Sequence, residues 1–374
     1  MSQTDAAPSL SIFEIPRFLV EPALRAFRLS NTALDMAFYD TGVLTTELLW
    51  RGALVTTLLR NLASASGEPQ SPPPIQGPSF SVLDLSALSN PEGCILVVDS
   101  TKAPFIQRFD RVDAFVDWLK SSGTDVKAVA ITGVGSSALG SAAFAWNASM
   151  ALGQRVAAIV PGYGVADVIY QALGGWYGFG VESWLEGLMH KMVAAAAPAA
   201  ARIGHGLLQT LPQSAQSDSS GQDFITGNPA SDILHALLSE APQLSALLGH
   251  SKGALVIENA LRSLEKNVTR RLWVTTFGCP IDESAPVARY MQFLGSFDSL
   301  GWSNSWGHRP EIRIPSHHST NTSVPFSMPV AILSRFALAS QIIAEPERLS
   351  QLSGLLPREA RSLEHRPAAP SDEN

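Results

Sequence analysis

Residues 244–261 read LSALLGHSKGALVIENAL: an apolar run, a short turn that contains Ser251, and then a helical pattern. This order predicts a buried strand that is joined directly to a helix. A side chain at so sharp a turn needs small residues two positions before and two after it, because the backbone is strained and neighbouring elements approach it closely. Gly249 and Gly253 meet that need. The sequence therefore predicts that the Ser251 hydroxyl stands above the edge of a sheet as a nucleophile.

The same alternation of short apolar runs and helical stretches continues on both sides of this turn. It predicts an α/β fold in which a mostly parallel sheet is covered by helices on both faces. A final helix is expected near residues 329–345. The expected strands lie within residues 94–100, 127–133, 155–164, 243–249, 270–280, 290–301 and 311–320.

Changes in composition along the chain predict its domain organisation. Residues 1–65 are expected to form a helical N-terminal extension, 66–92 a Pro/Gly/Ser-rich linker, and 93–345 the α/β core. Residues 165–240 interrupt the core and are expected to form an inserted cap, and residues 356–374 a disordered tail. The apolar stripe of the N-terminal helices either packs on the core or contacts a membrane surface or a partner.

The overall composition excludes several classes of protein. With 374 residues, 45% of them hydrophobic and 16% charged, the chain has a large core and is not intrinsically disordered. Its formal net charge of −7 argues against a nucleic-acid partner. Cys94 and Cys279 are too few for a disulfide framework or a cysteine zinc site.

The expected location of the protein is cytoplasmic, because the N-terminus lacks the basic-then-apolar order of a secretory signal. Residues 128–154 contain no charged residue and are long enough to test as a membrane span. Their Gly/Ser cluster instead predicts a strand, a turn and a helix.

A serine nucleophile needs a base to take its proton and a carboxylate to orient that base. In a nucleophile turn of this kind the acid follows the serine and the histidine comes last. Asp298 ends an apolar run and is the expected acid, with Asp282 and Glu283 as competitors. His318 follows the last expected strand and is the expected base, and its neighbour His317 is the alternative.

With these residues in place, the chain resembles the α/β-hydrolase superfamily and, within it, the lipase-like branch that includes class 3 lipases. The similar segments are GHSKG, FGCP after an expected strand, FDSLG and HHSTN, within roughly residues 93–345. The resemblance implies an α/β-hydrolase fold in which Ser251, Asp298 and His318 are nucleophile, acid and base. The chain departs from the family in having Lys252 after the serine and no recognisable oxyanion signature after an early strand.

A tetrahedral intermediate is stabilised by two N–H donors, which we expect at turns that follow strands. The first expected donor is the backbone N–H of Lys252, at the start of the helix that follows the nucleophile. For the second, the candidates are Ser100 or Thr101 in VVDSTKAP, and Gly162 or Tyr163 in IVPGYG. The order of the strands decides between them, and a single sequence does not give that order.

The expected activity is cleavage of a carboxylic ester through an acyl-enzyme, on a small-molecule or lipid-like acyl ester and without a cofactor or metal. Trp176, Tyr177 and Phe179 of the cap are expected to line the acyl pocket, although they could equally pack on the core. Acyl transfer on the same triad and a non-catalytic binding or scaffold role remain open. An NAD(P)-binding oxidoreductase is a weaker alternative, based on the glycines of residues 132–140.

Overall fold

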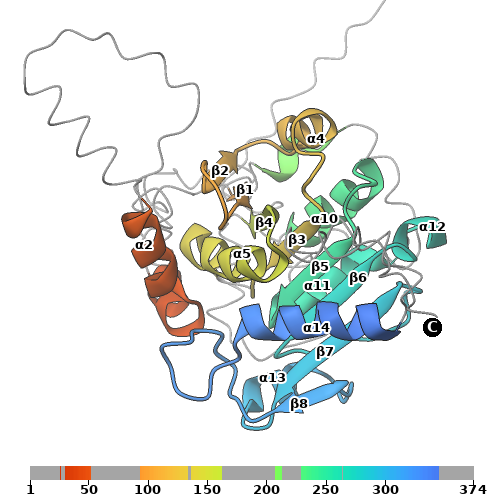
Figure 1. Cartoon of the computed structure of the whole chain (residues 1–374). Helices are drawn as coiled ribbons and strands as arrows, with labels where there is room; N and C mark the ends of the chain where they lie inside the picture. The colour runs from red at the N-terminus through yellow and green to blue at the C-terminus, as the bar shows by residue number, and fades with distance from the viewer. Residues whose placement is uncertain are drawn as a thin grey trace, which may run out of the picture.

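The computed structural model of the chain describes residue 26 and residues 30–51, 93–133, 136–161, 207–212, 229–262 and 264–344. At its centre is an eight-stranded sheet with the strand order β2-β1-β4-β3-β5-β6-β7-β8 (Figure 1). The strands are β1 (Gly93–Val98), β2 (Ile106–Phe109), β3 (Ala128–Ile131), β4 (Val156–Pro161), β5 (Ala246–His250), β6 (Trp273–Phe277), β7 (Arg289–Gly295) and β8 (Ile312–Ile314).

The strands from β4 to β8 in this order pair in parallel, as the sequence predicts for most of the sheet. Strand β1 is antiparallel to both of its neighbours, β2 and β4. The side chains of β1 alternate between two apolar clusters: Leu96 and Val98 point into one, Ile95 and Val97 into the other. A strand that is buried on both faces needs apolar residues at every position, which explains the continuous run GCILVV.

Helices cover both faces of the sheet (Figure 1). The first cluster packs α5 (Ala138–Leu152), α14 (Val330–Ala344) and part of α2 (Thr41–Trp50) against one face. The second packs α4 (Val112–Ser121), α10 (Pro229–Glu240) and α11 (Lys252–Leu261) against the other. Short elements complete the described fold: η2 (Leu208–Thr210), α12 (Lys266–Thr269) and α13 (Ser299–Asn304). The α/β class and the final helix are therefore confirmed.

Two expectations about the core need correction. The sequence does not predict β2, because its residues IQRF form a strand of only four residues at the edge of the sheet, with the polar Gln107 and Arg108 in its middle. The expected insertion over residues 165–240 extends too far, since α10 buries Ile233, Leu234 and Leu237 against the sheet. Residues 229–240 thus belong to the α/β core.

The N-terminal segment, which we define as residues 30–51, packs on the core. Residues 30–38 are helical, and Leu44 and Leu48 of α2 are buried in the first cluster, beside α5. At the end of α2, the Arg51 guanidinium donates to the carbonyl oxygen of Ser100 and lies over the Trp146 ring. Of the two expectations for the N-terminal helices, the described part fits packing on the core. The linker at 66–92 and the tail at 356–374 lie outside the described residues.

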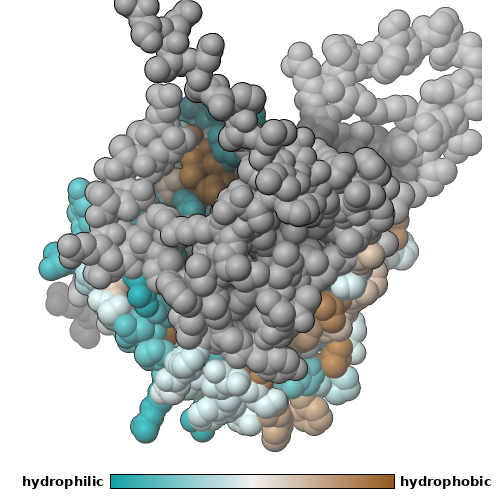
Figure 2. Space-filling model, turned by 180° about the vertical axis from the view of Figure 1, so that it is seen from behind, coloured by the Kyte–Doolittle hydropathy of each residue, from teal (hydrophilic) through white to brown (hydrophobic). Residues whose placement is uncertain are grey.

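Within residues 128–154, β3 (Ala128–Ile131) and α5 (Ala138–Leu152) form as predicted, with β3 in the middle of the sheet. No helix in the described ranges is both long and apolar enough to cross a bilayer. Seen from behind, the described surface mixes hydrophilic and apolar residues (Figure 2).

Candidate active site

The candidate site lies where the order of strands changes direction. From β3 the chain passes through α5 to β4 on one side, and then returns through α10 to β5 on the other side. The two crossing helices pack on opposite faces of the sheet. Such a switch point leaves a crevice at the carboxyl ends of the parallel strands, where α/β proteins bind their ligands. Ser251 directly follows β5 at this edge.

The turn around Ser251 has the strained geometry that the sequence predicts. Ser251 has φ 55° and ψ −130°, a region that residues other than glycine rarely adopt. A Cβ atom on Gly249 would lie 2.9 Å from the Cα of Ala254, and one on Gly253 would lie 2.7 Å from the Thr132 carbonyl oxygen. Both glycines are therefore required by close backbone contacts, as expected.

The structure brings Ser251, His318 and Asp298 into one chain of hydrogen bonds. His318 Nε2 lies 2.8 Å from Ser251 Oγ, and His318 Nδ1 lies 2.9 Å from each carboxylate oxygen of Asp298. An ionised carboxylate only accepts, so Nδ1 carries the hydrogen and donates it to Asp298. The unprotonated Nε2 then faces the serine hydroxyl, which donates to it. All three side chains are buried.

Local structure fixes the Asp298 carboxylate. Asp298 is the N-cap of α13, and its Oδ1 accepts from the Gly301 N–H at 2.6 Å. Gly278, after β6, has φ 69°, and a Cβ there would lie 3.1 Å from both Asp298 Oδ2 and His318 Nδ1. A glycine at 278 therefore leaves room for the Asp298–His318 pair.

The alternative acid and base residues lie elsewhere. His317 bonds within its own loop, since its Nδ1 accepts from the Ser319 N–H at 3.0 Å and its Nε2 donates to the Pro325 carbonyl oxygen at 2.8 Å. Glu283 accepts from the Gln292 amide at 2.8 Å. Burial, followed by the charges of Glu283 and Asp282, raises the pKa of Tyr290 in β7. The carboxylate that faces His318 Nδ1 is that of Asp298.

The prediction that Ser100 or Thr101 supplies the second oxyanion donor is wrong. Strand β1 runs opposite to β4, β3 and β5, so Ser100 and Thr101 lie at the opposite end of the strands from Ser251. Their N–H groups donate to Ser149 Oγ and Asp99 Oδ1, each at 2.8 Å. Gly162 and Tyr163 lie outside the described residues.

Lys252 lies at the start of the helix after Ser251, as the sequence predicts, and the loop after β3 also approaches the serine. Lys252 is the first residue of α11, and the N–H groups of a first helical turn point out of the helix N-terminus. A Cβ on Gly133, in the loop after β3, would lie 3.3 Å from Ser251 Cβ. The loop after β3 thus flanks Ser251, a contact that depends on β3 and β5 being neighbours.

The N-terminus of α5, where the weaker alternative expected a pyrophosphate, holds a carboxylate of the chain itself. Asp35 Oδ2 accepts from the Ser137 N–H at 2.7 Å and the Gly140 N–H at 3.2 Å. Burial raises the pKa of Asp35 to about 7, although its hydrogen bonds act in the opposite direction. This arrangement does not favour a dinucleotide site.

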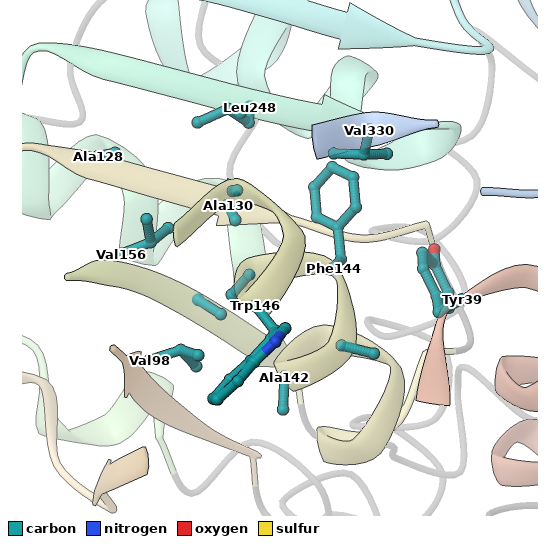
Figure 3. Packing of buried hydrophobic residues seen from close by; sticks show 14 of the residues in the cluster. Tyr39, Val98, Ala128, Ala130, Ala142, Phe144, Trp146, Val156, Leu248 and Val330 are labelled. Atoms are coloured by element: carbon teal, nitrogen blue, oxygen red, sulfur yellow. The ribbon is translucent and has the colours of Figure 1, made fainter. Parts of the chain in front are cut away.

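The site also includes residues that sequence reasoning missed. Phe38 meets the His318 ring edge-on, with a centroid distance of 6.0 Å. Tyr39 lies at the margin of the core beside Phe144 (Figure 3), and its hydroxyl is 3.0 Å from His250 Nδ1. His250, the residue directly before Ser251, bonds through Nε2 to the His318 carbonyl oxygen at 2.9 Å. Apart from the apolar helical pattern, nothing local in the sequence indicates that the N-terminal segment reaches this site.

Trp176, Tyr177 and Phe179, the expected pocket residues, lie outside the described residues. Across the described ranges, no group of three or more His, Cys, Asp or Glu side chains is arranged to hold a metal ion. Comparisons of the chain with protein-family models, curated proteins and solved structures find no match.

Proposed function

We propose that this chain is a serine hydrolase of the α/β-hydrolase type that cleaves carboxylic esters through an acyl-enzyme on Ser251. The observation that carries the proposal is the hydrogen-bond chain from Ser251 Oγ through His318 to Asp298, with distances of 2.8 and 2.9 Å. A base within hydrogen-bond reach of a hydroxyl, itself oriented by a carboxylate, is the arrangement that activates a serine.

In the proposed reaction, His318 Nε2 removes the hydroxyl proton as Ser251 Oγ attacks the ester carbonyl carbon. The resulting imidazolium is stabilised by Asp298 and returns the proton to the leaving alcohol oxygen as the C–O bond breaks. In the second half of the reaction, His318 Nε2 takes a proton from water as the water oxygen attacks the acyl carbon. His318 then returns this proton to Ser251 Oγ as the bond between Oγ and the acyl carbon breaks, which releases the carboxylic acid and regenerates the serine.

The tetrahedral intermediates place a negative charge on the former carbonyl oxygen. The backbone N–H of Lys252, at the N-terminus of α11, is the proposed first donor to that oxygen. The loop after β3 is the proposed source of the second, because Gly133 lies against Ser251 and this fold type takes that donor from the equivalent loop.

The alternatives receive less support. A non-catalytic binding role would be favoured if both histidines of the last loop lay far from Ser251, whereas His318 Nε2 is 2.8 Å from its hydroxyl. The Asp35 carboxylate at the N-terminus of α5 weighs against a nucleotide-dependent oxidoreductase.

The test is turnover of p-nitrophenyl esters of increasing acyl length by the wild-type protein, Ser251→Ala and a matched control. Ser121→Ala is suitable as the control, because the Ser121 hydroxyl is exposed on α4 and bonds only backbone carbonyls of its own helix among described partners. We expect Ser251→Ala to lower kcat by at least about 10³-fold and Ser121→Ala to leave it unchanged. Equal turnover by wild type and Ser251→Ala would refute the proposal.

A further inference from the structure

The hydroxyl of Tyr39 is the centre of a buried hydrogen-bond network beside Ser251. It lies 3.0 Å from the Gly133 backbone nitrogen, 3.2 Å from Ser136 Oγ and 3.0 Å from His250 Nδ1. These partners come from the loop after β3 and from the end of β5. One side chain of the N-terminal segment therefore connects two elements that border the nucleophile.

The chemistry of the partners fixes the direction of each hydrogen bond. A carbonyl oxygen only accepts, so His250 Nε2 carries the hydrogen that it donates to the His318 carbonyl at 2.9 Å. Burial, and then the neighbouring His318, lower the pKa of His250 to about 3, so its ring is neutral and Nδ1 accepts. Tyr39 consequently donates to His250 and accepts from the Gly133 N–H and the Ser136 hydroxyl.

This chain of bonds joins the two sides of the candidate site. At one end it holds Gly133, whose Cβ position would be 3.3 Å from Ser251 Cβ. At the other end it holds the backbone of His318, whose Nε2 is 2.8 Å from Ser251 Oγ. The rings pack in the same order, since the Tyr39 and His250 centroids are 5.3 Å apart and those of His250 and His318 are 4.9 Å apart.

The loop that carries His318 is also bonded directly to the backbone around Tyr39. Ser319 Oγ donates to the Ala37 carbonyl, and Thr320 donates through both N–H and Oγ to the Phe38 carbonyl, all at 2.7–2.8 Å. The Asn321 amide donates to the Met36 carbonyl at 2.7 Å. Tyr39 is thus held against the same loop that its network positions.

We propose that Tyr39 and His250 form a positioning pair, which sets the distance between the base His318, the nucleophile Ser251 and the loop after β3. The proposal rests on the proposed hydrolase function and adds to it that the N-terminal segment completes the active site. Neither residue is proposed to contact the reacting atoms. Their effect is on the geometry of His318 and of the loop around Gly133.

The first test is Tyr39→Phe, which removes the central hydroxyl and keeps the ring. Because small displacements of catalytic groups slow the chemical step, we expect kcat for p-nitrophenyl esters to fall by about 10²-fold with little change in KM. The matched control is Tyr290→Phe, since the Tyr290 hydroxyl bonds the Ala285 carbonyl at 3.1 Å, away from the site. A Tyr39→Phe variant with wild-type kcat would overturn the proposal.

The second test uses two substitutions at His250. His250→Gln keeps a donor and an acceptor at about the spacing of the ring nitrogens, whereas His250→Leu removes both. We expect Gln to preserve most of kcat and Leu to lower it as Tyr39→Phe does. The combined variant Tyr39→Phe/His250→Leu should be no slower than the slower single variant, because both act through one chain of bonds. Equal kcat for Gln and Leu, or fully additive losses in the combined variant, would count against a shared role.

A measurement that does not need turnover separates this proposal from the hydrolase function. The Nδ1 proton of His318, bonded to Asp298, can be followed by proton NMR in wild type and in Tyr39→Phe. We expect a sharp downfield signal in wild type that broadens or shifts in the variant. If wild type hydrolyses no ester yet shows this change, the proposed function fails and the positioning role holds. The same signal in both proteins overturns the positioning role.

Discussion

Ser251 occupies a backbone conformation that few residues besides glycine adopt, and close contacts of its neighbours hold it there. Its φ of 55° orients the side chain toward His318, while the N–H of Ser251 bonds the Phe277 carbonyl at 2.9 Å. Strain of this kind costs of the order of 1–3 kcal/mol and persists only where the surrounding structure holds the backbone in place. Gly253 contributes to this, because its missing side chain lets α11 pack closely against the backbone at the end of β3.

We predict that Gly253→Ala disrupts this turn. The new methyl group would press on the backbone of Ile131 and Thr132 and separate α11 from β3, which we expect to destabilise the protein by about 1–3 kcal/mol and to lower kcat. Urea denaturation and ester turnover measure the two effects.

Gly42→Ala is the control for that substitution, because a Cβ on Gly42 in α2 meets nothing within 4 Å. We expect it to stabilise the helix by up to about 1 kcal/mol. A Gly253→Ala protein with wild-type stability and activity would show that the close contact is not required.

Much of the candidate site could be predicted at the level of single residues, and the rest depended on long-range contacts. The serine turn, the aspartate at a strand end and the late histidine follow from local patterns. The preference for His318 over His317 agrees with the geometry, in which only His318 meets Ser251. The partnership of Tyr39 and His250, separated by 211 positions, has no local signature.

At the scale of elements, the N-terminal segment meets the N-terminus of α5 through Asp35. Burial raises the pKa of the Asp35 carboxyl from 3.8 to about 7, and burial, together with the Asp35 charge, raises the pKa of the Tyr39 phenol. Since the folded state holds this proton more tightly than the unfolded state, the stabilisation is full below about pH 4 and is lost as the pH rises through 7.

We therefore predict that the free energy of unfolding falls between pH 5 and pH 8, and that Asp35→Asn reduces this fall. Glu311→Gln should reduce it as well, because burial and then Glu283 raise the pKa of Glu311 to about 7. Urea denaturation across this pH range measures the slope for each variant. An Asp35→Asn slope equal to that of wild type would mean that Asp35 has an ordinary pKa in the folded protein.

The sequence predicts most strands correctly, because a strand buried on both faces is nearly all apolar, as AVAI in β3 and ALLGH in β5 illustrate. It does not predict the direction of β1, since the same apolar run serves a parallel or an antiparallel strand. Because β1 runs in the reverse direction, Ser100 and Thr101 lie at the opposite end of the strands from Ser251. The prediction that one of them is an oxyanion donor failed for this reason.

At the scale of the whole molecule, the N-terminal segment packs against the loop that carries His318, although the two are about 282 positions apart in the sequence. Asp40 connects them: its Oδ1 accepts from the Thr322 N–H and hydroxyl at 2.5 and 2.7 Å, and its Oδ2 from the Asn147 amide at 2.5 Å. The Asp40 side chain is buried. It therefore ties the N-terminal segment to both α5 and the loop that carries His318.

We predict that Asp40→Ala destabilises the protein by about 1–3 kcal/mol, because it leaves buried donors without their acceptor. Glu47→Ala in α2, the helix that Asp40 precedes, is the control, since its exposed ion pair with Arg51 is worth less than about 1 kcal/mol. Urea denaturation should separate the two variants clearly. Equal stability of Asp40→Ala and Glu47→Ala would mean that Asp40 does not fasten the segment.

The central claim is that His318 activates Ser251 as a nucleophile, and covalent labelling tests it most directly. A fluorophosphonate probe would be reacted with wild type, Ser251→Ala and His318→Gln, and the modified peptide identified by mass spectrometry. We predict rapid labelling at Ser251 in wild type, none at that position in Ser251→Ala, and labelling slowed by at least about 10³-fold in His318→Gln. Failure of wild type to label at Ser251, or equal labelling rates in wild type and His318→Gln, would contradict the claim.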